Sequence, residues 1–245
     1  MLVIIPHRPA AQQGHELRLA VEGWKQHFKH PYPVRIIVVG EGLTPMDGVE
    51  CVESKRVLPR KGQYTPHLDY VSCARKVYML HPYTKGFIVA ADDVFAVNDF
   101  TLHDVQIPKV QELEMPIEWD DENPWRWDLA KTATACKLDG LGMFNWTTHL
   151  PHYYKWKRLF EIYDRYDCDT ESHTIENLYY NHFYKDCQPY LLHRNDPWKF
   201  EVSYRPLDRE GLRDAFARKK WVTCTENGWS YAMEQELAAH YQIEL

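Results

Sequence analysis

Residues 85–97 read KGFIVAADDVFAV. The apolar run that begins at Phe87 has the length and composition of a buried strand. It ends abruptly in two adjacent carboxylates, Asp92 and Asp93, before a second apolar pair. Carboxylates at the end of a buried strand carry a high desolvation cost unless a cation or hydrogen-bond donors compensate them. In open α/β sheets ligands bind at the carboxyl ends of the strands, so the stretch predicts an α/β fold with a polar site there.

Two interpretations of Asp92 and Asp93 stay open at this point. Mg²⁺ and Mn²⁺ prefer carboxylate oxygens and commonly bind together with substrate phosphates, so the pair is typical of a metal site that carries a diphosphate. Asp side chains also accept backbone N–H groups in turns and at helix N-termini. For the dipeptide alone the turn is the simpler explanation, so the order of the surrounding elements has to decide.

The first hundred residues alternate between strand and helix. Strands are expected at 2–6, 34–39, 49–52 and 87–91, with amphipathic helices at 14–30 and 68–80. A strand, a helix and a second strand within forty residues form a βαβ unit with a right-handed parallel crossover. The pattern predicts a Rossmann-related sheet of mostly parallel strands with helices on both faces.

The remaining residues predict further elements of the same single domain, which spans residues 1–245. Helices are expected at 129–138, around 159–166, and at 174–184, 207–220 and 230–241, and strands at 140–144, 189–193 and 221–224, after an irregular acidic segment at 101–127.

Composition and motifs exclude several classes of function. The net charge of −6 argues against a strongly basic nucleic-acid binder. No GxxxxGK[ST] loop is present, and Gly40 and Gly42 follow the second strand without forming a GxGxxG fingerprint. The sequence contains no CxxC pair, so a structural zinc site is not expected.

The sequence also predicts a compartment. No apolar run approaches the roughly 18 residues that span a membrane, and the opening apolar stretch is too short for a signal peptide. We therefore expect a cytoplasmic protein with reduced cysteines and no stable membrane insertion.

The order of elements resembles the GT-A type of nucleotide-sugar glycosyltransferase. Three segments carry the resemblance: Val3-Ile4-Ile5-Pro6 with Arg8, the strand end Val38-Val39-Gly40, and Ala91-Asp92-Asp93-Val94-Phe95. In that family a strand-end Asp-x-Asp or Asp-Asp motif ligates Mn²⁺ or Mg²⁺ on the diphosphate of the donor. The resemblance implies a GT-A-like fold, metal dependence, and a nucleotide-sugar donor, with a UDP-sugar favoured. It also implies nucleotide and metal binding by residues 1–100 and acceptor binding by residues 101–245.

A narrower resemblance points to the Stealth family, which is thought to transfer sugar-1-phosphates during polysaccharide synthesis. It rests on four blocks: Glu16-Leu17-Arg18, Asp92-Asp93-Val94-Phe95, His149-Leu150-Pro151 and Trp221-Val222-Thr223-Cys224. Ala91 stands where that pattern has a polar residue. A Stealth-like transferase would release a nucleoside monophosphate, whereas a glycosyltransferase releases a diphosphate.

The resemblance assigns residues to the donor. Asp92 and Asp93 are expected to ligate the metal, with His193 at the end of a late strand as third ligand. A turn is the simpler explanation for the acid pair taken alone, and a strand-end hydrogen bond would explain His193 equally well. The nucleotide is expected beside the ends of the first two strands and the metal strand. Its predicted contacts are Pro6, His7, Arg8, Gly40, Arg75, Lys76, Ala91 and Asp92.

An inverting transferase also needs a general base that takes the proton of the acceptor hydroxyl. Glu176 is the first candidate and His152 the second, and Asp120 or Asp121 in the acidic segment would be an alternative. Each of these side chains is also compatible with a structural role. The sequence does not distinguish an inverting from a retaining reaction.

The acceptor stays open between a glycan, a lipid-linked sugar and a hydroxymethylated base in phage DNA. Aromatic side chains near Trp125, Trp127 and Trp146 are candidates for stacking on a sugar ring or a flipped base. A non-catalytic module that binds nucleotide sugars is a further alternative, although the intact acid pair argues against it.

Overall fold

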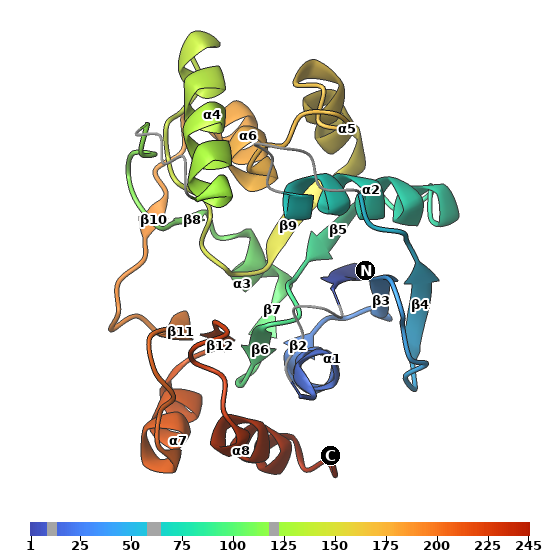
Figure 1. Ribbon diagram of the computed structural model, residues 1–245, viewed down its shortest axis with the longest axis vertical. Coiled ribbons are helices and arrows are strands. Elements are labelled where there is room, and N and C mark those ends of the chain that lie inside the picture. Colours follow the sequence, from blue (N-terminus) through green and yellow to red (C-terminus); the bar gives the residue numbers. More distant parts are fainter. Residues whose placement is uncertain (9–13, 58–64, 118–122) are drawn as a thin grey trace.

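The computed structural model describes residues 1–8, 14–57, 65–117 and 123–245, which form a mixed α/β domain (Figure 1). Its central sheet has five strands in the order β4-β3-β1-β5-β9. The strands are β1 (Leu2–His7), β3 (Arg35–Gly40), β4 (Val49–Glu53), β5 (Gly86–Val89) and β9 (His152–Lys155). The first four run parallel, and β9 pairs antiparallel with β5. The predicted mostly parallel sheet is confirmed.

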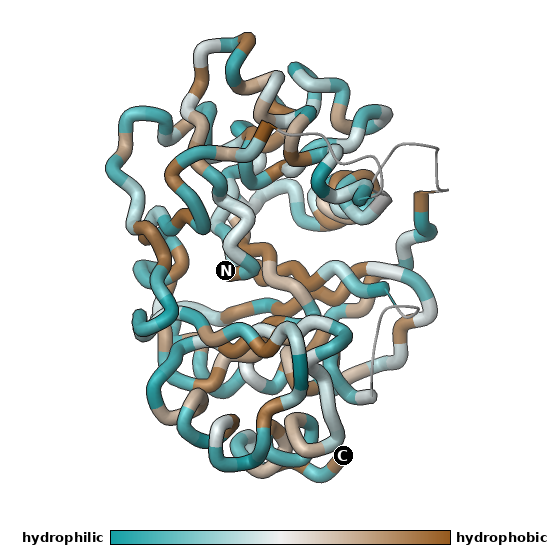
Figure 2. The backbone as a smooth tube through the Cα atoms, turned by 60° about the vertical axis from the view of Figure 1, so that its left-hand side comes forward, coloured by the Kyte–Doolittle hydropathy of each residue, from teal (hydrophilic) through white to brown (hydrophobic). Residues whose placement is uncertain are grey.

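Helices cover both faces of this sheet because its strands alternate apolar side chains between the faces. Leu2 and Ile4 of β1 pack into the core beneath α2 (Thr65–Leu80), and Val3 and Ile5 pack toward α1 (Glu16–His27). Figure 2 shows the apolar strands gathered in the middle of the molecule. Two hydrophobic cores, one on each face, therefore hold the strand ends at fixed positions.

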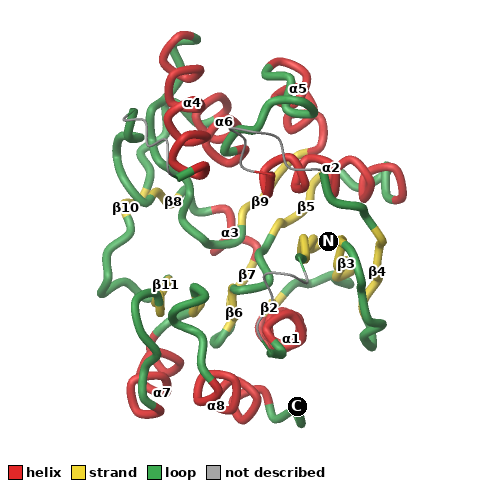
Figure 3. The backbone as a smooth tube through the Cα atoms, in the orientation of Figure 1, coloured by secondary structure: helices red, strands yellow, loops and turns green. Residues whose placement is uncertain are grey.

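The second half of the chain adds to both sides of the sheet (Figure 3). Helices α4 (Pro124–Leu138), α5 (Trp156–Arg165) and α6 (Ile175–Phe183) share the core of α2. A second sheet contains β6 (Val94–Ala96), β11 (Lys199–Val202) and β12 (Trp221–Cys224), and it packs with α7 (Arg209–Arg218) and α8 (Tyr231–Tyr241). The chain crosses from the first sheet to the second between β5 and β6, where Asp92 and Asp93 form a turn.

Short elements complete the described chain. They are β2 (Phe28–Lys29) with β7 (Phe100–Thr101), α3 (Leu102–Gln106), and β8 (Lys109–Val110) with β10 (Tyr190–Leu191). In the described ranges no helix combines the length and apolarity that crossing a membrane requires.

The predicted strand at 140–144 is wrong. Gly140 has a left-handed backbone, with φ of 63°, and the backbone of Phe144 bonds to the Asn181 side chain rather than to a neighbouring strand. One isolated bridge joins Glu112 to Asn145. The predicted strand at 189–193 is reduced to β10. The segment at 101–127, expected to be irregular, contains β7, α3 and β8, and α4 already begins at Pro124.

Candidate functional site

The strand order reverses between β1 and β5, because β3 lies on one side of β1 and β5 on the other. A crevice forms at such a switch point, outside the carboxyl ends of the strands. Here it is a cavity of about 450 Å³. The strand ends contribute Pro6, His7, Arg8, Gly40, Ala91 and Asp92. Strand β9 contributes His152 and Tyr154, and the surrounding helices and loops contribute residues that include His67, Asp69, Tyr70, Trp125, His149 and Glu176.

Asp92 faces this cavity and is held by His7. The Nδ1 atom of His7 lies 2.8 Å from Oδ2 of Asp92. The His7 side chain is almost completely buried, and about a quarter of the Asp92 side chain is exposed. The hydrogen bond therefore fixes one carboxylate oxygen at the end of β1 and leaves the rest of the group at the cavity surface.

Asp93 points to other partners. Its Oδ2 lies 4.0 Å from Nδ1 of His149, and its Oδ1 is buried without a hydrogen-bond partner in the described chain. Burial raises the pKa of Asp93 to about 6, while the nearby His149 lowers it and the Asp92 carboxylate raises it. An ionised carboxylate with an unpaired buried oxygen is costly, so a cation or a hydrogen-bond donor beside Oδ1 would stabilise the ionised form of Asp93.

The acid pair fits a divalent cation in part. Two adjacent carboxylates, one with an unsatisfied oxygen, are suitable hard ligands. Among the described residues, however, no three His, Cys, Asp or Glu side chains come together as a metal-binding group. His193 does not join the acids: it is exposed beyond β10, and its backbone N–H donates to Asp196. Substrate oxygens and water would have to complete the coordination.

Arg8 lies where the sequence predicts a contact to the diphosphate. It lines the cavity, and its guanidinium donates to Oδ2 of Asp69 on α2, with Nε at 3.0 Å. Asp69 in turn accepts the backbone N–H of Val57. The two basic residues Lys55 and Arg56, after β4, also line the cavity.

The structure does not bring Arg75 and Lys76 to the cavity. The guanidinium of Arg75 donates to Asp169, with Nε and Oδ1 2.6 Å apart, and lies over the ring of Phe160. The amino group of Lys76 donates to the backbone carbonyl of Glu53. Both side chains therefore have structural partners outside the cavity lining.

Gly40 is required by the backbone. A Cβ atom built at Gly40 would lie 2.2 Å from the carbonyl oxygen of His7, its neighbour across the β1–β3 pair. A side chain there would displace the strand end that carries His7. The glycine therefore has a structural role at the cavity floor, whatever contact it makes to a ligand.

The predicted bases Glu176 and His152 both line the cavity. The Nε2 of His152 donates to the carbonyl of Trp146 at 3.1 Å, and burial lowers the pKa of His152 to about 4. Glu176 lies among tyrosines and contributes to raising the pKa of Tyr70 and Tyr154, which burial raises most. Asp120 and Asp121 lie outside the described residues.

The three tryptophans that the sequence offers for stacking differ in where they lie relative to the cavity. Trp125 lines the cavity from the first turn of α4, whereas Trp146 is buried in the core and its indole N–H donates to Asn181. Trp127 is not among the residues that line the cavity. Only Trp125 of these three is therefore placed to stack on a cavity ligand.

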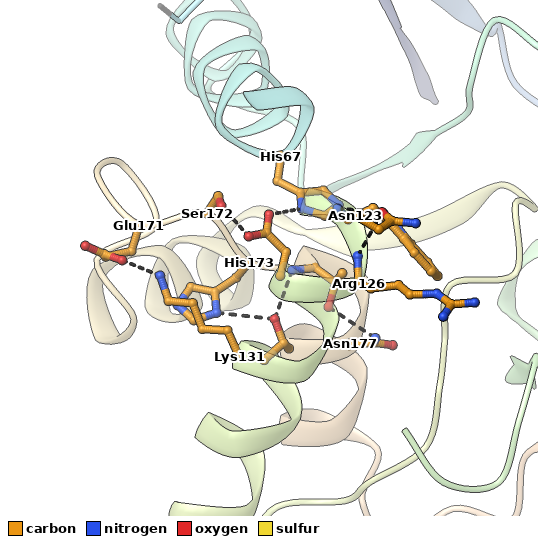
Figure 4. A network of polar contacts seen from close by, with 12 residues as sticks. His67, Asn123, Arg126, Lys131, Glu171, Ser172, His173 and Asn177 are labelled. Atoms are coloured by element: carbon orange, nitrogen blue, oxygen red, sulfur yellow. Dashed lines mark hydrogen bonds and ion pairs between the residues drawn. The ribbon is translucent and has the colours of Figure 1, made fainter. Parts of the chain in front are cut away.

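Sequence reasoning missed a histidine–carboxylate pair at this cavity. The Nδ1 atom of His67, in the first turn of α2, lies 2.7 Å from Oδ2 of Asp128 on α4 (Figure 4). The hydroxyl of Ser172 donates to the other oxygen of Asp128 at 2.6 Å. The two bonded pairs are 61 and 44 positions apart in the sequence, so no local motif indicates them.

His149 was also missed as a site residue. It lines the cavity with a left-handed backbone, at φ of 53°, and more than half of its side chain is exposed. A positive φ in a residue other than glycine is uncommon and often occurs at functional sites. The sequence block His149-Leu150-Pro151 was the available signal.

Comparisons with known proteins find similarity to solved structures, at low sequence identity. No protein-family model and no curated protein matches the chain. Among solved structures, the chain is similar to a glycosyltransferase involved in the glycosylation of the major capsid of PBCV-1. The alignment covers 99% of this chain and 98% of that one, with 11% sequence identity and a TM-score of 0.42. A similarity this low does not indicate which activity the chain has. Its function therefore has to be argued from the site.

Proposed function

We propose that the protein is a glycosyltransferase that uses a nucleotide-sugar donor. One observation carries the proposal: the cavity at the switch point combines a strand-end carboxylate, Asp92, with a guanidinium, Arg8, and a wall of aromatic side chains. Cationic groups suit a diphosphate, and aromatic faces suit sugar rings and bases. These features support a GT-A-like donor site.

The donor would lie along the strand ends. The nucleoside, in a UDP-sugar for example, would pack beside Pro6 and the strand end at Gly40. The diphosphate would meet Arg8, with the exposed cations Lys55 and Arg56 nearby. Arg8 is held by Asp69, so its guanidinium is partly oriented before a ligand arrives.

We also propose metal dependence, with Asp92 and Asp93 holding Mn²⁺ or Mg²⁺. A bound divalent cation neutralises the charge that gathers on the departing diphosphate. The residues of the chain do the rest: His7 orients the Asp92 carboxylate through its Nδ1, and the unpaired Oδ1 of Asp93 would gain a partner.

The acceptor hydroxyl would enter from the side of α2, α4 and α6, where Tyr70, Trp125 and Glu176 line the cavity. An aromatic face with one carboxylate is suited to a sugar ring and its hydroxyl groups. An acceptor glycan, a lipid-linked sugar and a modified DNA base all present such a hydroxyl. The negative net charge makes DNA the least favoured of the three.

The deciding experiment is a donor screen. The protein is incubated with Mn²⁺ and UDP-glucose, UDP-galactose, UDP-N-acetylglucosamine or GDP-mannose, and the released nucleotide is identified by chromatography. Release of a nucleoside diphosphate, abolished by EDTA, is expected. Release of a monophosphate would indicate sugar-phosphate transfer instead. Calorimetric binding without turnover would indicate a binding module, and neither binding nor turnover would refute the proposed donor site.

A further inference from the structure

The buried carboxylate of Asp128 is unusual in its surroundings. The residue is completely buried, and its partners are a histidine and a serine hydroxyl. In the described chain no Lys or Arg forms an ion pair with it. An interior carboxylate is costly, and apolar residues usually fill such a position with less loss of stability. Its placement behind a cavity-lining imidazole indicates that it serves His67.

The contact fixes the state of the His67 ring. An ionised carboxylate only accepts hydrogen bonds, so Nδ1 of His67 carries the proton that is shared with Asp128. In the neutral ring the basic nitrogen is then Nε2. The same carboxylate stabilises the imidazolium that forms when Nε2 takes a second proton. Of the two side chains, His67 is 13% exposed and Asp128 only 1%, so the accessible group of the pair is the imidazole.

Ser172 does not turn this pair into a nucleophilic triad. Its hydroxyl donates to the carboxylate and not to the imidazole, so His67 is not placed to activate it. Its role is to hold the second oxygen of Asp128. The orientation of the His67 ring is therefore fixed by contacts from α4, through Asp128, and from the loop before α6, through Ser172.

We propose that His67 is the catalytic base of this cavity and that Asp128 is its positioning residue. The inference rests on the glycosyl-transfer function proposed above. In the step, an acceptor hydroxyl oxygen attacks the anomeric carbon of the donor. The bond from that carbon to the diphosphate oxygen breaks, and its electron pair leaves with the diphosphate. The hydroxyl proton passes to Nε2 of His67, which later releases it to water.

The two bases expected from the sequence are less suited to this step. The Nε2 of His152 already donates to a backbone carbonyl. Glu176 has no hydrogen bond or ion pair with any described residue that would orient its carboxylate. It serves better as an acceptor for substrate hydroxyl groups, which places it in substrate binding rather than in proton transfer.

The test compares His67→Ala, His67→Gln, Asp128→Asn and Glu176→Gln in the hydrolysis of UDP-glucose with Mn²⁺, where water is the acceptor. If UDP-glucose is not hydrolysed, the fastest donor of the panel replaces it. Loss of a general base lowers kcat about 10²–10⁴-fold, and donor KM should hardly change in the His67 variants. Added imidazole should restore part of the kcat of His67→Ala, which leaves room for it, but not of His67→Gln. Asp128→Asn should lower kcat because an amide favours the wrong tautomer.

The control is His27→Gln. His27 forms a comparable pair with Asp99, at 3.1 Å, but lies outside the cavity lining. This variant should keep the kcat of the wild type. Thermal unfolding shows which variants fold. If His67→Ala does not fold, the loss of kcat is measured on His67→Gln instead.

The outcomes separate the two proposals. An active wild type whose kcat is unchanged in His67→Gln refutes His67 as the base. So does a His67→Ala variant that loses activity, gains nothing from imidazole and binds UDP more weakly, because that pattern belongs to a structural residue. Loss of kcat confined to Glu176→Gln would move the base there. A wild type that hydrolyses no donor refutes glycosyl transfer, and the base role falls with it.

Discussion

The Nδ1 atom of His7 and the Oδ2 atom of Asp92 lie 2.8 Å apart across the point where the strand order reverses. His7 ends β1, and Asp92 follows β5, so one hydrogen bond joins the two strand ends that form the cavity floor. An acid at this place would otherwise be free to rotate. The pairing gives the carboxylate one orientation before any ligand binds.

The first prediction concerns Asp92→Asn. An amide is a poorer ligand for a hard cation than a carboxylate and does not balance its charge. Turnover of the donor should fall more than about 100-fold, by analogy with the loss of other charge-stabilising groups. The amide oxygen still accepts from His7, so the free energy of unfolding should change by less than about 1 kcal/mol. Steady-state kinetics and urea unfolding check both values. Wild-type turnover in this variant would show that Asp92 belongs to a turn alone.

Asp93→Asn should behave differently in the metal-free protein. Burial raises the pKa of Asp93 to about 6, so its ionised form destabilises the folded state at pH 7.5. The neutral amide should therefore raise the free energy of unfolding, by on the order of 1–3 kcal/mol. Urea unfolding in EDTA measures the difference, with Asp92→Asn as the matched control. A less stable Asp93→Asn would contradict this account.

A third prediction separates Arg8 from Arg75. Arg8→Ala should raise the donor KM about tenfold or more, because a charged hydrogen bond to the diphosphate is worth roughly 1.5–3 kcal/mol. The acceptor KM should change less. Arg75→Ala removes an ion pair to Asp169, outside the cavity lining, and should leave the donor KM unchanged. Equal donor KM values in the two variants would place the diphosphate away from Arg8.

The fold was largely predictable because its strong signals are local. The apolar strands around Val3, Ile36 and Ile88 and the helix at α1 follow from periodicity within ten or fifteen residues. The strand order then placed the ends of β1, β3 and β5 together, so Pro6, Arg8 and Asp92 were correctly expected on one edge. The false strand at 140–144 arose because Asn181, some forty residues away, supplies its hydrogen bonds.

The site beyond the strand ends was not predictable in the same way. Arg75 and Lys76 lie on α2, the helix that precedes β5 in the chain, but a helix turns side chains away from its packed face as well as toward it. The pairing of His67 with Asp128 depends on how α4 packs beside α2. No short-range pattern contains that relationship, since neither the spacing nor the residue types distinguish it from surface residues.

The fourth prediction is a pH dependence of stability due to His173. This side chain is buried on the loop before α6, near Thr132 on α4, and burial lowers its pKa to about 4. The unfolded chain, with a pKa near 6.5, binds a proton between pH 6.5 and 4 that the folded protein does not bind. Stability should therefore fall as the pH drops through this window, by up to about 3 kcal/mol from this group.

His173→Asn tests this contribution, because a neutral side chain cannot take up the proton. Urea unfolding at pH 4.5, 5.5, 6.5 and 7.5 should show a smaller loss of stability in the variant than in the wild type. The comparison of slopes cancels all other titrating groups. Parallel curves would show that His173 is not the residue responsible.

The last prediction concerns Gly40→Ala. The added Cβ would lie 2.2 Å from the carbonyl oxygen of His7, which is backbone and cannot rotate away. Either β1 and β3 separate at their ends or the new side chain strains the sheet, and overpacking of this kind typically costs about 1–3 kcal/mol. Since the same displacement moves His7, and with it Asp92, donor turnover should fall together with stability.

Gly140→Ala is the matched control, because a Cβ there meets nothing within 4 Å and only its left-handed φ of 63° opposes alanine, at about 1 kcal/mol. Thermal unfolding and donor kinetics on both variants decide the point. A Gly40→Ala variant as stable as the wild type but with weak donor binding would mean that the glycine serves the ligand directly rather than the strand end.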